Sequence, residues 1–113
     1  MDEIQLYNII YTKSATQDIL EKADYIASEL HENELALKWY HRFRQQLQKN
    51  LSSFPFMYPA YDREPWKTKG YRLLTTANDV VLYTVDENSA TVYIHAVCTR
   101  GRDLSKHLNE TQT

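Results

Sequence analysis

Cysteine, glycine and proline are all scarce in this sequence, and each scarcity excludes a class of protein. Cys98 is the only cysteine among 113 residues, so no disulfide can form within the chain. With two glycines and three prolines, the chain lacks the composition of a long disordered linker. No apolar run approaches the roughly 20 residues that span a bilayer. The first residues, Met1 to Ile4, also lack the basic and apolar parts of a signal peptide. These absences together predict a cytoplasmic protein with no membrane partner.

The chain does have enough apolar residues for one core, because 42% of its 113 residues are hydrophobic. We therefore expect a single domain over residues 1–113. The formal net charge of −2 conceals an uneven distribution. Residues 1–34 carry eight acids and two bases, whereas residues 35–113 carry seven acids and eleven bases. Such segregation can make one surface repel nucleic acid and another attract it, although solvated charges on both parts would give the same count.

The first half of the chain predicts a strand followed by two helices. Residues 4–11 are rich in β-branched and aromatic side chains, which favours a strand. Ser14 and Gln17 have the spacing of a capping box, so a helix is expected over residues 15–30 with Ser14 as its N-cap. Asn33 is expected to cap a second helix that runs to about residue 52. The short break between them predicts an antiparallel hairpin. The expected apolar stripes are Ile19, Leu20, Ala23, Ile26, Ala27 and Leu30 in the first helix, and Ala36, Trp39, Tyr40, Phe43, Leu47 and Leu51 in the second.

The second half predicts an antiparallel meander. Three prolines keep residues 53–66 out of regular structure. Strands are then expected at 71–75, 80–85 and 91–97, joined by turns, with Val92, Ile94 and Ala96 on one face of the last strand. Asp103 is expected to cap a short closing helix. The predicted fold class is α+β, with the order strand, helix hairpin, three-stranded meander and short C-terminal helix. The place of the first strand in the sheet is left open.

Several segments carry a resemblance to a known family. They are Tyr11-Thr12-Lys13-Ser14-Ala15-Thr16-Gln17-Asp18-Ile19, Phe54-Pro55, Tyr58-Pro59, Glu64-Pro65-Trp66-Lys67-Thr68-Lys69-Gly70-Tyr71-Arg72-Leu73-Leu74, Tyr83-Thr84-Val85-Asp86 and Arg102-Asp103. In this order and spacing, the chain resembles toxins of the RelE/ParE superfamily over residues 6–108. The resemblance implies a toxin of a type II toxin–antitoxin system, which is neutralised by a cognate antitoxin in a hetero-oligomer.

The resemblance leaves the target open. Toxins of this superfamily either cleave messenger RNA, usually on the ribosome, or inhibit DNA gyrase. A third alternative is a degenerate toxin that acts only as an antitoxin-binding co-repressor. Ribonuclease members often carry His, Tyr or Lys where this chain has Thr99, and Arg where it has Val80. These two differences, with a sequence pI of about 6.1, favour the gyrase-type activity. Whether the chain is an enzyme stays open.

RNA cleavage would need cations that stabilise the scissile phosphate. The candidate catalytic residues are Arg72, Arg100 and Arg102. The candidates for binding nucleic acid or another target are Arg63, Lys67, Lys69, Tyr71 and Lys106. These residues form one group around the first meander strand and another after the last strand. They converge only if the flanking loops fold toward the same rim of the sheet.

Other kinds of site have little support in the sequence. The four histidines fall in separate elements without ligand-like spacing, so no metal site is predicted. The chain has no glycine-rich phosphate loop, and we predict no cofactor. Cys98 is expected to be a small buried side chain. Tyr83 and Tyr93 are expected to pack. The basic part of the chain and the apolar residues of the loop Phe54–Tyr61 predict a docking surface for an acidic antitoxin segment.

Overall fold

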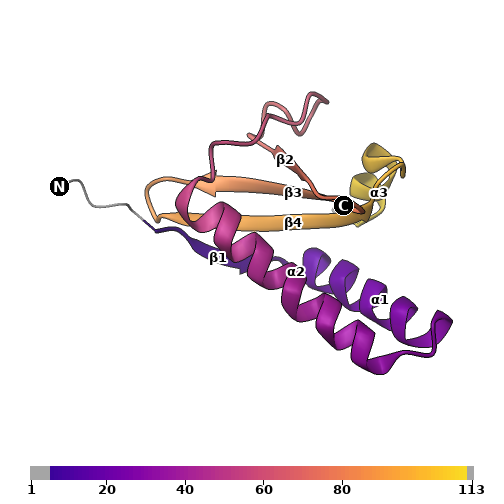
Figure 1. Cartoon of the computed structure of the whole chain (residues 1–113). Coiled ribbons are helices and arrows are strands. Elements are labelled where there is room, and N and C mark those ends of the chain that lie inside the picture. The colour runs from indigo at the N-terminus through magenta and orange to yellow at the C-terminus, as the bar shows by residue number, and fades with distance from the viewer. Residues whose placement is uncertain (1–5, 112–113) are drawn as a thin grey trace.

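The computed structural model describes residues 6–111 (Figure 1). It contains a four-stranded sheet with one core on each face. The elements are β1 (Asn8–Tyr11), α1 (Lys13–Glu29), α2 (Asn33–Ser53), β2 (Arg72–Thr75), β3 (Asp79–Asp86), β4 (Thr91–Thr99) and α3 (Leu104–Thr111). This order confirms the predicted α+β fold. Figure 1 shows α1 and α2 side by side as a hairpin that extends past one end of the sheet.

The first strand joins the sheet beside the last one. The strand order is β1-β4-β3-β2, and β1 runs parallel to β4 with Asn8 opposite Thr91. The pairs β3–β4 and β2–β3 are antiparallel, as expected for a meander. The chain between β1 and β4 contains the helix hairpin, β2 and β3, so this parallel pair has the long connection that it needs. The hairpin itself connects β1 to β2, the two edge strands, and it packs on one face of the sheet.

The predicted N-cap of the first helix was wrong by two residues. Thr12 is the N-cap, and its side-chain oxygen accepts a hydrogen bond from the Ala15 N–H at 3.2 Å. The Thr12 N–H itself still donates to the Ile94 carbonyl at 3.0 Å. The chain thus leaves the sheet at Thr12 and enters the helix at once. Ser14 lies within the first helical turn and is not the cap.

Two further boundaries differ from prediction. Asn33 is the first residue of α2, and the N-cap Glu32 makes no side-chain capping bond. Leu6 and Tyr7 precede the first strand, which begins at Asn8, because the Tyr7 N–H donates to the Ser52 carbonyl at 2.8 Å. That bond draws the chain toward the end of α2 before the strand starts. The first two residues of the predicted strand lie outside the described residues.

The larger core lies between the helix hairpin and the sheet. Its buried residues are Ala15, Ile19, Phe43, Leu47, Leu51, Leu74, Val81, Tyr83, Val92, Ile94 and Val97. Tyr83 is fully buried, so its predicted packing role is confirmed, and its hydroxyl donates to the Pro55 carbonyl at 2.6 Å. Two residues were wrongly placed in the predicted apolar stripe of the first helix, since Leu20 is 52% and Leu30 is 53% exposed. Leu20 points about 100° away from Ile19 on the helix, and Leu30 is the C-cap residue.

A second core covers part of the opposite face. It consists of Tyr61, Trp66, Tyr71, Val80, Leu82, Ala96 and Leu108. Ala96 was expected to share a face with Ile94, and this was wrong. Leu82 pairs with Ala96 whereas Tyr83 pairs with Ile94, so His95 is an extra residue in β4. This β-bulge shifts the alternation of side chains and turns Ala96 to the second face.

Candidate functional site

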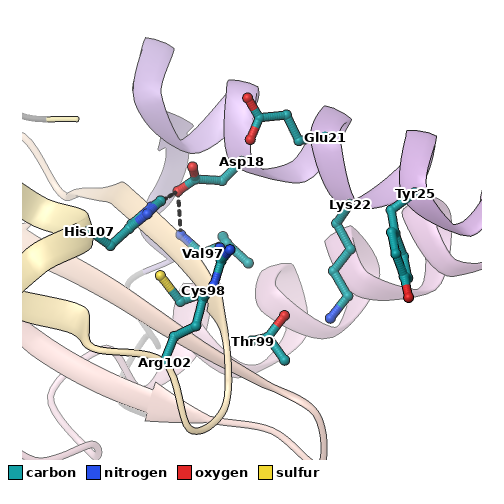
Figure 2. A pocket seen from close by; sticks show the side chains of 9 residues that line it. All are labelled: Asp18, Glu21, Lys22, Tyr25, Val97, Cys98, Thr99, Arg102 and His107. Carbon is teal, nitrogen blue, oxygen red and sulfur yellow. Dashed lines mark hydrogen bonds and ion pairs between the residues drawn. The ribbon is translucent and has the colours of Figure 1, made fainter. Parts of the chain in front are cut away.

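A pocket of about 540 Å³ lies between α1 and the end of β4 (Figure 2). It is lined by Asp18, Glu21, Lys22 and Tyr25 from α1, by Val97, Cys98 and Thr99 from β4, and by Arg102 and His107 from the segment after it. Two separate stretches of sequence, residues 18–25 and 97–107, therefore meet at one place. Most of the polar side chains among them are ionisable, which makes the pocket the candidate site of the molecule.

Asp18 occupies the floor of this pocket. Its side chain is only 4% exposed, and one carboxylate oxygen accepts hydrogen bonds from the Val97 N–H at 2.9 Å and from Nε2 of His107 at 3.0 Å. These bonds, drawn in Figure 2, join α1 to both β4 and α3. Sequence reasoning did not single out Asp18 as a site residue. The signal that could have found it is an acid on the helix face that also carries Ala15 and Ile19.

A second buried acid is neutralised from the same helix. Lys22 forms an ion pair with Asp79, the buried first residue of β3. The Lys22 ammonium also lies 5.5 Å from the centre of the Trp39 ring. The Asp79 N–H donates to the Thr76 hydroxyl at 3.0 Å, which fixes the β2–β3 turn. The ion pair therefore ties the sheet to the helix hairpin. It was also missed from the sequence, because its partners are far apart in the chain.

Arg102 projects into the pocket from the turn that follows β4 (Figure 2). Its guanidinium makes no hydrogen bond or ion pair to the rest of residues 6–111. Neighbouring Asp103 is already used, since its carboxylate accepts from the Lys106 N–H at 3.1 Å and so caps α3 as predicted. Cys98 is buried, as expected, and burial raises the pKa of its thiol to about 11. Arg102 is therefore the cation of this pocket that is not committed to the fold.

Arg72 and Arg100, the other two candidate catalytic residues, lie elsewhere. Arg72 donates to the Tyr58 carbonyl at 2.6 Å and to the Phe56 carbonyl at 3.4 Å. Its register partner Tyr83 is opposite Ile94, five residues before the end of β4 at residue 99, or roughly 16 Å along the strand. Arg100 lies just past that end and donates to the Ala77 carbonyl at 3.4 Å. The structure thus separates Arg72 from the other two arginines.

The candidate binding residues fall on the second face of the sheet. Arg63, Lys67 and Lys69 lie in the exposed turn that precedes β2, and Lys67 forms an ion pair with Asp62 at 3.0 Å. Tyr71 is buried, and Lys106 is exposed on α3. The turn contacts α3, because the Tyr61 and Ser105 hydroxyls are 3.2 Å apart. The structure therefore brings the turn next to the C-terminal helix but leaves Arg72 on the other face. The roles of these residues stay predictions.

The contacts of Arg72 lead to the first test. We expect Arg72→Ala to lower the free energy of unfolding by about 1–2 kcal/mol, since it removes charged hydrogen bonds and the guanidinium that lies 5.1 Å from the Phe56 ring centre. Limited proteolysis within residues 54–61 should also become faster. Arg63→Ala, which removes an exposed arginine, should change stability by less than about 0.5 kcal/mol. Equal effects of the two variants would contradict an anchoring role for Arg72.

His95 lies beneath Tyr71, with ring centres 4.6 Å apart and an interplanar angle of 23°. Its Nε2 is 2.8 Å from the Thr84 hydroxyl. Burial lowers the pKa of His95 below its ordinary value of 6.5. The folded state therefore binds fewer protons than the unfolded state at mildly acidic pH. The stability linked to this group is present above pH 6.5 and is lost as pH falls toward the lower, folded-state pKa.

We therefore expect the free energy of unfolding to decrease between pH 7.5 and pH 5.5 more steeply in the wild type than in His95→Gln. Urea denaturation at a series of pH values measures this slope. The variant also loses packing against Tyr71, so its stability should be lower at pH 7.5 and the two curves should converge on acidification. Parallel curves would show that His95 does not contribute to the acid sensitivity.

Among residues 6–111, no group of three or more histidine, cysteine, aspartate or glutamate side chains is placed to hold a metal ion. Every helix in the same range is too short or too polar to span a bilayer.

Comparison with known proteins identifies the family. The model of the ParE toxin of the parDE type II toxin–antitoxin system matches residues 9–104. No curated protein matches the sequence. The structure is similar to a chain of the toxin–antitoxin complex RelBE2 from Mycobacterium tuberculosis, with a TM-score of 0.65 and 19% identity over 90% of this chain and 100% of that one. It is also similar to a chain of the chromosomal ParDE system from P. aeruginosa, with a TM-score of 0.66 and 20% identity over 84% and 97% of the two chains. Both structures share the fold, and the match over residues 9–104 shows that this chain belongs to the ParE toxin family of type II toxin–antitoxin systems.

Proposed function

We propose that the chain arrests bacterial growth in the cytoplasm by binding a protein target, DNA gyrase, and that it does not act by cutting RNA. The observation that carries the proposal is the environment of Val80. This residue stands where ribonuclease members of the superfamily often carry an arginine, and here it belongs to the second core. Tyr61, Trp66 and Leu108 belong to the same buried cluster. A cation at this position would have to displace that apolar layer before it could meet a phosphate.

The positions of the other candidate groups support the same proposal. Proton transfer to and from RNA needs a titratable group within hydrogen-bond reach of the ribose. Thr99 has a hydroxyl that does not titrate near neutral pH, Cys98 is buried, and His95 is packed under Tyr71. Arg72 is engaged with two loop carbonyls. In this arrangement the exposed cations are suited to recognition of a partner more than to catalysis.

A paired biochemical assay tests the proposal. Purified protein is added to a gyrase supercoiling reaction and, in parallel, to a translation reaction whose messenger RNA ends are mapped. We expect supercoiling to be inhibited and the RNA to stay intact. New RNA ends that disappear in Arg72→Ala or Arg102→Ala would instead support a ribosome-dependent endoribonuclease. Absence of both effects, together with normal growth of cells that accumulate the protein, would support the degenerate co-repressor.

We also propose that a cognate antitoxin binds this chain as a hetero-oligomer and docks on the loop Phe54–Tyr61. Phe54, Phe56 and Met57 are exposed there, although Arg72 and Tyr83 hold the loop to the sheet through its carbonyls. A fixed loop that displays apolar side chains loses little entropy on binding. Co-purification with the product of the neighbouring gene tests this. Binding should be lost in a Phe56→Ser, Met57→Ser double variant and retained in Leu37→Ser, which alters an exposed leucine on α2.

A further inference from the structure

We infer that the pocket between α1 and the end of β4 binds a carboxylate of an acidic segment in a partner protein, and that Arg102 is the residue that receives it. The inference deepens the proposed function and rests on it only in taking a protein as the ligand.

Two of the three acids at the pocket are bonded to other groups within the fold. Asp18 accepts from the Val97 N–H and from His107, and Asp79, next to the lining, is paired with Lys22. Glu21 stands at the rim and accepts from the Gln17 side chain at 3.0 Å. Arg102 has no such partner within residues 6–111. Inside the pocket, the charged group without a bonded partner is therefore the positive Arg102 guanidinium, whereas at the rim the exposed group is the negative Glu21 carboxylate.

Arg102 borders two hollows. With His107 it lines both the pocket and an adjoining hollow, whose other lining residues are Asp103 and Lys106. An arginine fork can hold a carboxylate through two parallel hydrogen bonds. Tyr25 is 63% exposed beside it and offers an aromatic surface to the neighbouring residue of the partner. These features describe an anchor for an acidic residue with an apolar neighbour.

A phosphate could also bind a guanidinium, but the surroundings favour a protein. Glu21 and Asp24 are exposed on α1, and residues 1–34 as a whole carry eight acids against two bases. A nucleic-acid backbone brings a series of phosphates, of which those beyond the pocket would approach these acids and be repelled. An acidic protein segment need place only one carboxylate in the pocket. Apolar residues elsewhere in the segment can contact Tyr25.

The test uses the purified full chain labelled with ¹⁵N and two probes. One is a capped 12-residue peptide of alanine and serine with a single central Glu-Phe pair, and the other is a 12-nucleotide single-stranded RNA. We expect the peptide to shift the amide signals of residues 18–25 and 97–107. Arg102→Gln should weaken the peptide at least about tenfold, because it removes a charge-assisted hydrogen bond. Arg42→Gln, an exposed arginine on α2, should change the affinity less than about twofold.

A substitution at the rim of the pocket should change the peptide affinity in the opposite direction. Glu21→Gln removes a negative charge near the entering carboxylate and should tighten peptide binding about two- to threefold. The inference is overturned if the wild type does not bind the peptide, if Arg102→Gln binds it equally well, or if the RNA binds these residues more tightly in an Arg102-dependent manner. Growth arrest without peptide binding would leave the proposed function in place and remove the inference. Peptide binding without gyrase inhibition would support the inference and contradict the proposed function.

Discussion

Replacing Asp18 with alanine is expected to cost about 3–5 kcal/mol of unfolding free energy, because it breaks a buried charged contact and leaves a buried donor without an acceptor. The carboxylate is 4% exposed and binds the Val97 N–H and His107 together. For a domain of this size the melting temperature should fall by roughly 10–20 °C. Differential scanning calorimetry or urea denaturation measures the loss.

The control for Asp18→Ala is Asp24→Ala. Asp24 is exposed on the same helix, so its removal changes the helix charge equally but breaks no buried contact. We expect a change of less than about 0.5 kcal/mol. Asp18→Asn should fall between the two, since its amide oxygen still accepts one hydrogen bond. If Asp18→Ala and Asp24→Ala have the same stability, the carboxylate does not join the three elements as described.

Replacing Trp66 with alanine should produce the second large effect, again about 3–5 kcal/mol. Trp66 is buried, its ring centre lies 5.9 Å from that of Tyr61, and its carbonyl accepts from the Tyr71 N–H. The side chain thus fixes an irregular segment over the sheet. Leu108 belongs to the same cluster, so loss of Trp66 should also expose α3.

Hydrogen exchange detects this second consequence. In Trp66→Ala, the amides of α3 should exchange faster, whereas those of α1 and α2 should exchange at rates that follow only the global stability. Phe54→Ala provides the comparison, because Phe54 is aromatic but exposed, and it should cost less than about 0.5 kcal/mol. Unchanged protection of α3 in Trp66→Ala would show that the two cores do not depend on this side chain.

The order of the elements could be predicted because local patterns determine it. The apolar stripes of the helices, the turn residues and the near-continuous apolar run over Val80–Val85 are properties of neighbouring residues. The β-bulge at His95 could not be predicted, since it depends on how β4 pairs with β3. The first strand's position also depended on a distant partner, Thr91.

The candidate site was predicted only in part, for the same reason. Arg102 was a candidate because it lies in the basic group after the last strand and in the Arg102-Asp103 pair that resembles the family. Asp18 and His107 are 89 residues apart, and Lys22 and Asp79 are 57 apart. No local pattern joins such pairs. Arg72 was selected for its charge, but its contacts with Phe56 and Tyr58 depend on where the proline-containing loop returns to the sheet.

The parallel pairing of β1 with β4 has a consequence for synthesis on the ribosome. Asn8 can pair with Thr91 only after 83 further residues have been added to the chain. Asp18 can bind His107 only after 89 further residues. At about 5–20 residues per second, that delay lasts several seconds. During this time the helix hairpin has no completed sheet to cover. The sheet that the hairpin covers is therefore completed only late in synthesis, after β4 has been made.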